Sequence, residues 1–325
     1  MSKQNNKECL ITGGAGFIGS HLAEELLNQD HNVTVIDDLS TGRFKNIEHL
    51  VDNPKFQFSI ESITNKVVMD RLVSECDIIF HLAAAVGVKK IISDPVGVIE
   101  TNILGTHSVL KAASRYRKKI LVASTSEIYG KNTNVPFDEE SDRILGPTTQ
   151  SRWSYSSSKA VDEFLTLAYN RQKELPVVIC RFFNIIGPRQ TGQYGMVVPT
   201  FIGQALSNEP LTVYGDGKQT RTFCDARDTV RAVSQLAFND DAIGKVFNIG
   251  GTEEISIKSL ADKIIDLTNS NSKIEYISYD EAYESGFEDM RRRVPDIEKI
   301  KNVINFKQQY NLEDTIQEII DIYAE

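Results

Sequence analysis

Cysteine is scarce in this chain, and no two cysteines have the CxxC spacing of a metal or redox site. The four cysteines are Cys9, Cys76, Cys180 and Cys224, and two of them, Cys9 and Cys180, lie in apolar runs. Isolated thiols in apolar runs are typical of reduced core residues. We therefore expect no disulfides, no metal site and a cytoplasmic location.

Excess positive charge and long apolar runs are also lacking. The 325 residues include 36 Lys and Arg against 45 Asp and Glu, a net charge of −9, which argues against nonspecific binding to nucleic acid. No apolar stretch is long enough to span a bilayer, and nothing resembles a signal peptide. The sequence predicts a soluble protein with no membrane partner, and its length favours about two structural units.

A glycine-rich loop, Gly13-Gly14-Ala15-Gly16-Phe17-Ile18-Gly19, follows an apolar strand at 9–12 and precedes an amphipathic helix at 20–28. This order is typical of dinucleotide-binding folds. Gly13 permits the tight turn, Gly16 lets backbone N–H groups approach a pyrophosphate, and Gly19 lets the helix pack closely on the strand.

Two aspartates follow the next strand. The apolar run 33–36 ends at Asp37 and Asp38, roughly twenty residues past the loop, where an acidic side chain binds the ribose hydroxyls of a dinucleotide. A carboxylate there repels a 2′-phosphate. The sequence therefore predicts NAD rather than NADP as the cofactor.

Strand and helix patterns alternate through the first half of the chain. Strands are expected at 33–36, 55–59, 78–81, 120–124 and 177–182, and helices at 67–74, 99–115 and 155–172. Such alternation predicts an α/β fold of the Rossmann type, a doubly wound parallel sheet covered on both faces. We assign residues 1–182 to this NAD-binding domain, with a chain return around 222–250.

After residue 183 the pattern loosens into Gly, Pro and polar turns. Short strands at 211–213 and 247–249 are followed by helices at 257–268 and 312–323. We interpret residues 183–325 as a smaller C-terminal α/β lobe that binds the substrate over the carboxyl edge of the sheet.

Tyr155 and Lys159 are one helical turn apart and project from one helix face. A tyrosine near its ordinary pKa of about 10 is a poor base, but a nearby ammonium favours the phenolate. The strand at 120–124 delivers Thr125 and Ser126 to the carboxyl edge of the sheet, where ligands bind. There a hydroxyl can hydrogen-bond a carbinol while Tyr155 removes its proton. Taken alone, the Tyr and Lys would more commonly be neighbours on an exposed helix.

These motifs resemble the extended short-chain dehydrogenase/reductases that act on nucleotide sugars, over essentially the whole chain. The motifs that carry the resemblance are the glycine loop, His81-Leu82-Ala83-Ala84, Asn102, Ser124-Thr125-Ser126-Glu127-Ile128-Tyr129-Gly130, Tyr155 to Lys159, Arg181-Phe182-Phe183-Asn184 with Gly187-Pro188-Arg189, and Val213-Tyr214-Gly215-Asp216-Gly217.

The resemblance implies a tightly held NAD and a sugar that passes through a 4-ketone. It implies cofactor contacts beyond the glycines and aspartates at Phe17, Ile18, Ser40, Thr41, Gly42, Leu82, Ala83, Ala84, Asn102, Ser124, Tyr155 and Lys159. It implies that the substrate, a nucleotide sugar and most readily a UDP-sugar, is bound by Asn184, Arg189, Val213 and Arg221.

Glu127 discriminates among members of this family. A 4-ketone makes a C6 carboxylate a β-keto acid, so a charged partner beside C5 and C6 opens paths closed to a simple epimerase. The Ser126-Glu127 pair most resembles the UDP-glucuronate decarboxylases, which also bring an arginine from a segment similar to Arg291-Arg292-Arg293-Val294-Pro295-Asp296 to the sugar. We expect Arg292 to hold a carboxylate or a diphosphate, with Thr125, Ser126, Glu127, Tyr155 and Lys159 as the catalytic set.

Four hypotheses follow. The first is an NAD-dependent UDP-hexuronate decarboxylase, and the second a UDP-sugar or UDP-uronate 4-epimerase. A nucleotide-sugar 4,6-dehydratase is disfavoured because Ser126 stands where the hexose dehydratases carry an aspartate, although GDP-mannose dehydratases resemble the chain in carrying Thr-Ser-Glu. The fourth is a non-catalytic NAD-binding scaffold protein. Relatives commonly dimerise through helices near 101–115 and 155–172, so we expect a homodimer.

Overall fold

The computed structural model describes residues 6–87, 93–192, 195–282 and 290–324. Its centre is a seven-stranded sheet in the order β11-β6-β5-β4-β1-β2-β3, and all neighbouring strands are parallel. The strands are β1 (Glu8–Thr12), β2 (Asn32–Asp37), β3 (Phe56–Ile60), β4 (Ile78–His81), β5 (Lys119–Thr125), β6 (Val177–Phe183) and β11 (Lys245–Gly250). The expected doubly wound α/β fold is confirmed.

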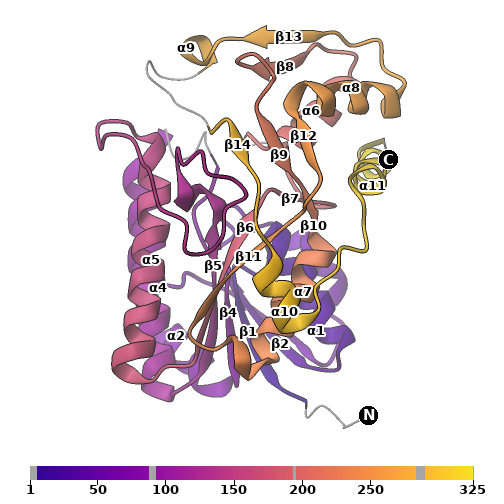
Figure 1. Ribbon diagram of the computed structural model, residues 1–325. Coiled ribbons are helices and arrows are strands. Elements are labelled where there is room, and N and C mark those ends of the chain that lie inside the picture. The colour runs from indigo at the N-terminus through magenta and orange to yellow at the C-terminus, as the bar shows by residue number, and fades with distance from the viewer. Residues whose placement is uncertain (1–5, 88–92, 193–194, 283–289, 325) are drawn as a thin grey trace.

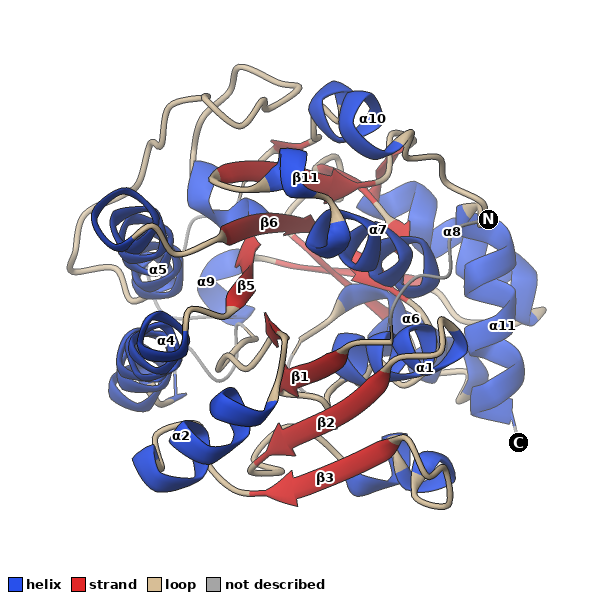
Figure 2. Cartoon of the chain, turned by 90° about the horizontal axis from the view of Figure 1, so that it is seen from below, coloured by secondary structure: helices blue, strands red, loops and turns tan. Residues whose placement is uncertain are grey.

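Helices cover both faces of this sheet because its strands are apolar on both sides. One face carries α1 (Phe17–Asn28), α7 (Ala226–Phe238) and α10 (Glu298–Ile304), and the other carries α2 (Lys66–Glu75), α4 (Pro95–Tyr116) and α5 (Arg152–Lys173) (Figure 2). The central strand β4 is buried at every residue. Two separate apolar cores therefore hold the sheet between its helix layers.

Two expected helices begin earlier than the sequence indicated. Helix α4 begins at Pro95, where proline suits the first helical turn, and the Asp94 side chain accepts a hydrogen bond from the Gly97 N–H at 3.0 Å. Helix α5 begins at Arg152 rather than Tyr155. The earlier start places Arg152 in the same first turn as Tyr155.

The C-terminal lobe lies beyond the carboxyl ends of the strands (Figure 1). Its paired strands are β7 (Ile185–Ile186) with β10 (Cys224–Asp225), β8 (Leu211–Tyr214) with β13 (Ile274–Ile277), and β9 (Thr220–Thr222) with β12 (Glu254–Ser256) and β14 (Arg292–Arg293). Its helices are α6 (Val197–Leu206), α8 (Ile257–Thr268), α9 (Tyr279–Ala282) and α11 (Leu312–Ala324), and a third apolar core joins α6, α8 and α11.

The direction in which successive strands are added to the sheet reverses between β3 and β4. From β1 the order runs outward through β2 and β3, and then β4 pairs with the opposite side of β1. In open parallel sheets such a switch point leaves a crevice outside the carboxyl ends of the strands. The fold therefore predicts a ligand site where the lobe covers this edge.

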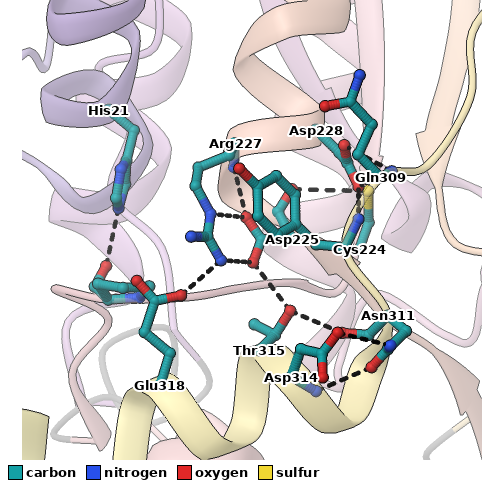
Figure 3. Close-up of polar contacts among 12 residues, drawn as sticks. His21, Cys224, Asp225, Arg227, Asp228, Gln309, Asn311, Asp314, Thr315 and Glu318 are labelled. Carbon is teal, nitrogen blue, oxygen red and sulfur yellow. Dashed lines mark hydrogen bonds and ion pairs between the residues drawn. The ribbon is translucent and has the colours of Figure 1, made fainter. Parts of the chain in front are cut away.

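Asp225 joins helix α11 to the rest of the molecule (Figure 3). Its buried carboxylate accepts hydrogen bonds from Nε and Nη2 of Arg227, at 2.9 and 2.7 Å, and from the hydroxyl of Thr315 on α11 at 2.9 Å. Arg227 also pairs with Glu318 at 2.6 Å and lies 3.7 Å above the ring of Tyr310. One buried acid thus connects the start of α7 to α11.

Along the part of the chain that the structure describes, no helix is both long and apolar enough to cross a membrane. All four cysteines are free and buried, as expected from their apolar surroundings.

Replacing Asp225 by alanine should lower the free energy of unfolding by about 3 kcal/mol, because it removes the common acceptor of Arg227 and Thr315 and leaves both donors partly buried. Urea denaturation measures this loss. The control is Asp314→Ala. Asp314 is an exposed residue of α11 whose carboxylate accepts a hydrogen bond from Asn311, and its replacement should cost less than about 1 kcal/mol. Equal losses in the two variants would contradict the anchoring role of Asp225.

Candidate active site

A cavity of about 760 Å³ lies between the carboxyl edge of the sheet and the C-terminal lobe. The glycine loop and the ends of β2, β4, β5 and β6 form one wall. Residues of the lobe, from β8, β9 and β14, form the other. The cavity therefore occupies the crevice that the strand order predicts.

The glycine loop fits the close approach of a dinucleotide. Gly13 has φ +72°, and a Cβ there would lie 2.8 Å from the backbone of Ala83. A Cβ on Gly19 would lie 2.2 Å from the carbonyl oxygen of Gly13. Gly16 is the N-cap of α1, whose positive N-terminus faces the cavity through Phe17 and Ile18. The N-terminus of α1 would therefore stabilise an anion such as a pyrophosphate in the cavity.

Asp37 and Asp38 both line the cavity, but they make different contacts. The Asp37 carboxylate accepts hydrogen bonds from the backbone N–H groups of Ala15 and Leu39 at 3.0 and 2.8 Å, so it fixes the glycine loop. Burial raises the pKa of Asp37. The Asp38 carboxylate accepts a local hydrogen bond from the backbone N–H of Ser40, and its side chain suits a ribose hydroxyl.

Gly42 and Asn102 support the cavity from behind instead of lining it. A Cβ on Gly42 would lie 2.7 Å from a carboxylate oxygen of Asp37, so glycine is needed for the aspartate to take its place. Buried Asn102 accepts from the Ala85 N–H at 2.8 Å and donates to the Ala85 carbonyl at 3.3 Å. Both residues position the expected cofactor-binding segments from outside the cavity.

Tyr155 meets Thr125 at the end of β5. The Thr125 hydroxyl lies close enough to the Tyr155 hydroxyl to act on its pKa, and it accepts a hydrogen bond from the Glu127 N–H at 3.2 Å. Burial, followed by the negative charge of Glu127, raises the pKa of Tyr155, and the nearby Thr125 hydroxyl only partly offsets this. The phenol therefore keeps its proton at neutral pH in this structure.

Lys159 does not pair with Tyr155 here. Its buried ammonium donates to the carboxylate of Asp162 at 2.8 Å. His81 lies behind this pair, and burial, with a smaller effect of the Lys159 charge, lowers the pKa of His81 to about 3. The expectation that Lys159 favours the Tyr155 phenolate is thus corrected for this structure, because the Lys159 ammonium pairs with the Asp162 carboxylate instead.

Glu127 lies between two arginines. Its carboxylate pairs with Arg152 at the start of α5 and with Arg293 of β14, whose Nη1 lies 2.5 Å from Oε1. Burial opposes ionisation of Glu127, but the charges and hydrogen bonds of the two arginines outweigh it and lower the pKa to about 2. Arg293 also donates to Oδ1 of Asn184. A second carboxylate entering here would meet two guanidinium groups.

Two expected substrate residues point away from the cavity. Arg292 is about half exposed and pairs with Glu254 on the outside of the lobe, whereas Arg293 lines the cavity. Val213 is fully buried in the core of the lobe, whereas its neighbours Thr212 and Tyr214 line the cavity. Successive side chains of a strand point to opposite faces, so each expectation missed by one position.

The remaining substrate residues do line the cavity. Asn184 donates to the Thr222 carbonyl at 2.8 Å, and Arg221 donates to the carbonyls of Thr220 and Met290, both at 2.8 Å. Arg189 pairs with Glu24 of α1. Residues 193 and 194, a few positions after Arg189, lie outside the described residues.

The cavity therefore gathers most of the expected residues from distant parts of the sequence. They are Gly13, Gly16, Phe17, Ile18, Gly19, Asp37, Asp38, Ser40, Thr41, Leu82, Ala83, Ala84, Ser124, Thr125, Ser126, Glu127, Tyr155, Lys159, Asn184, Arg189 and Arg221. Their individual roles toward a ligand stay predictions.

Sequence reasoning assigned no role to three charged residues, Arg152, Arg293 and Asp162. Arg152 stands three positions before Tyr155, so the same helical turn could have identified it. The strand alternation around Arg292 could have identified Arg293. Asp162 gave no signal beyond its spacing from Lys159. Within the described ranges, no group of three or more His, Cys, Asp or Glu side chains is arranged to hold a metal ion.

Comparisons with known proteins agree with this geometry. The family model described as GDP-mannose 4,6 dehydratase matches residues 10–319. The chain is 45% identical to UDP-N-acetyl-alpha-D-glucosaminuronate decarboxylase of Bacillus cytotoxicus, over 98% of each protein. It is 36% identical to UDP-glucuronic acid decarboxylase 1 of Xenopus tropicalis, over 99% of this chain and 73% of that protein.

A solved structure has the same fold over nearly the whole chain. It is UDP-glucuronic acid 4-epimerase from Bacillus cereus in complex with UDP-glucuronic acid and NAD. The TM-score is 0.88 at 30% identity, and the match covers 98% of this chain and 99% of that one.

Glu127 should stabilise the fold in a pH-dependent way. Its folded pKa of about 2 lies below the ordinary 4.5, so its stabilisation is fully present above 4.5 and is lost as pH falls toward 2. Urea denaturation at several pH values should therefore show Glu127→Gln less stable than the native chain near neutral pH, by about 3 kcal/mol. The two curves should converge in acid. A difference that does not change with pH would contradict the paired, ionised carboxylate.

Proposed function

The chain belongs to the GDP-mannose 4,6 dehydratase family of extended short-chain dehydrogenase/reductases, and from this premise we propose that it is an NAD-dependent decarboxylase of UDP-hexuronates. The observation that carries the proposal is the pair of arginines, Arg152 and Arg293, around Glu127 and next to Tyr155. A sugar with its C4 hydroxyl at Tyr155 would bring a C6 carboxylate toward these guanidinium groups.

The chain's residues divide the chemistry between them. The glycine loop and Asp38 would hold NAD, which supplies a hydride acceptor for C4 when bound. Thr125 and Tyr155 would bind the C4 hydroxyl, and Tyr155 would take its proton. A ketone at C4 makes the C6 carboxylate a β-keto acid, so loss of carbon dioxide would leave an enolate across C4 and C5. A proton taken up at C5, with the hydride and the Tyr155 proton returned to C4, would then give the UDP-linked pentose.

The arginines would hold the substrate carboxylate by charge-assisted hydrogen bonds. A guanidinium has five N–H donors in a rigid fork, so one arginine can contact two carboxylates. Glu127 is fixed as an anion, so it cannot act as a proton donor until the arginines are redirected. We assign it the role of orienting Arg152 and Arg293 on the substrate.

Two sugars are the first substrates to test. The relative at 45% identity is named for a substrate with an acetamido group at C2, and the relative at 36% is named for UDP-glucuronate. UDP-glucuronate 4-epimerisation is the second candidate, because the epimerase structure matches 98% of this chain. The cytoplasmic location and the domain boundary at residue 182 stay predictions.

Purified protein with NAD should release carbon dioxide from UDP-glucuronate or its 2-acetamido analogue and leave a UDP-linked pentose. Mass spectrometry of the product measures this. Formation of UDP-galacturonate without loss of mass would support the epimerase instead, and no turnover of either sugar would remove the proposal.

Neighbouring arginines supply a matched control for the same assay. Arg293→Ala should lower kcat/KM by about a hundredfold, because it removes one of two charges that hold the carboxylate. Arg292→Ala should change kcat/KM by less than about twofold, since Arg292 pairs with Glu254 on the outside of the lobe. A larger loss with Arg292→Ala would contradict the assignment.

We also propose that the protein forms a homodimer through α4 and α5. These helices lie side by side on one face of the molecule (Figure 2), and together they carry five exposed large apolar side chains. They are Val96, Ile99, Leu104, Val161 and Phe164. Ala160 of α5 is buried and packs with Tyr129 in the apolar core, so it is not one of these exposed side chains.

Phe164→Glu should convert the dimer to a monomer, because a charge would replace an apolar side chain of α5 that is 66% exposed. Light scattering at micromolar concentration measures the mass. Ile322→Glu, at an exposed apolar position on α11, should leave the mass unchanged. A monomeric native protein would contradict the proposal.

A further inference from the structure

Asp162 is a buried carboxylate behind the site, and nothing in the expected chemistry uses it. It lies on α5, three residues after Lys159, and its side chain is 1% exposed. Its Oδ2 accepts from the Lys159 ammonium at 2.8 Å, and the Lys159 side chain is itself 3% exposed. A buried ion pair of this kind is costly to form, because both charges lose their contact with water.

The polar groups that lie behind this pair, Thr106 and His81, are neutral. The Thr106 hydroxyl lies close enough to Asp162 to lower the pKa of its carboxyl, and it contacts Nε2 of His81 at 3.0 Å. Nδ1 of His81 contacts the Thr12 hydroxyl at 2.8 Å. With its pKa at about 3, His81 is uncharged at neutral pH. Lys159 and Asp162 therefore balance each other's charge.

Asp162 Oδ1 is buried and receives no hydrogen bond of ordinary length from the described residues. Burial therefore keeps the pKa of Asp162 above its ordinary value, against the opposing effect of Lys159. The carboxylate depends mainly on the ammonium for its stabilisation. Moving Lys159 toward Tyr155 would leave a buried charge without its partner.

The position of the Lys159–Asp162 pair affects the pKa of Tyr155. Charged side chains around it come from several elements, and Asp162 is one of those that raise the pKa of the phenol. The charged groups that face Tyr155 or the Lys159–Asp162 pair are Glu127, Arg152, Arg293, Glu163 and Arg181, and the last two pair with each other at 2.8 Å. Asp162 both contacts Lys159 and acts on Tyr155.

We propose that Asp162 is a positioning residue that holds the Lys159 ammonium away from Tyr155 and thereby sets the pH at which Tyr155 becomes a base. Two anions, the Asp162 carboxylate and the Tyr155 phenolate, compete for one ammonium. The carboxylate holds it while the phenol is protonated. This inference deepens the proposed function, and only its kinetic test rests on that function.

The direct test is a near-ultraviolet titration of tyrosinate in the protein without added NAD or substrate. The difference between the native chain and Tyr155→Phe isolates one phenol, and it should titrate above the ordinary pKa of about 10. Asp162→Asn should lower that pKa by about one unit, a tenfold gain in acidity, because it removes a negative charge and releases the ammonium.

Thr106→Val is the matched control for disturbed packing. It removes the hydroxyl beside Asp162 but leaves the carboxylate and the ammonium in place, so the Tyr155 titration should stay within a few tenths of a unit. In the kinetic test, the acid limb of kcat against pH should move to lower pH in Asp162→Asn by the same amount. A purely structural role would lower kcat and leave the limb in place.

Three results would overturn the proposal. The first is a native Tyr155 that titrates at or below about 10 without NAD, which needs only the conservative Tyr155→Phe variant and so decides even if Asp162→Asn does not fold. The second is an unchanged or raised pKa in Asp162→Asn, and the third is an equal shift in Thr106→Val. Failure of the decarboxylase assay leaves the spectroscopic titration intact, so the two proposals fail separately.

Discussion

The Glu127 carboxylate joins the two halves of this molecule by charge at the wall of the cavity. Arg152 reaches it from the first turn of α5, beside the sheet, and Arg293 reaches it from β14 in the C-terminal lobe. Because burial penalises an unpaired charge heavily, the three groups stabilise one another only when both halves are in place. The wall of the cavity and the relation between the sheet and the lobe therefore depend on the same contact.

A similar balance governs the rest of the cavity. Each buried charge near the reacting position has a named partner: Glu127 has its two arginines, Lys159 has Asp162, and Arg181 has Glu163. The phenol of Tyr155 lies among these pairs, and the nearby Lys159 ammonium is held by Asp162. Its reactivity is consequently set by how the neighbouring charges are shared, more than by the single lysine next to it in the motif.

The sequence predicted the fold and most of the cavity, because both depend on periodic patterns. Apolar runs at the right intervals specify β1 to β6, and the glycines specify where the first helix can approach the first strand. Two errors had one cause: Val213 and Arg292 each lie next to the residue that faces the cavity. A two-residue strand such as β14 has too few positions to reveal which side faces inward.

Contacts between distant segments were beyond the reach of the sequence. Helical spacing places Lys159 and Tyr155 on one face, but it also places Asp162 within reach, and only the folded structure decides which acceptor the ammonium takes. Asp37 is a second example. Its position at the strand end predicts a ribose ligand, but the fold also gives it the backbone of the glycine loop to hold.

The anchor at Asp225 bears on the order in which the protein can assemble during synthesis. Its hydrogen-bond donor on α11, Thr315, is translated 90 positions later. A nascent chain that has completed the sheet must therefore carry this acid with only its local arginine until α11 emerges from the ribosome. The C-terminal lobe can complete its packing against α11 only at that late stage. A stalled or shortened chain would therefore leave the α11-facing part of the lobe exposed to chaperones and proteases.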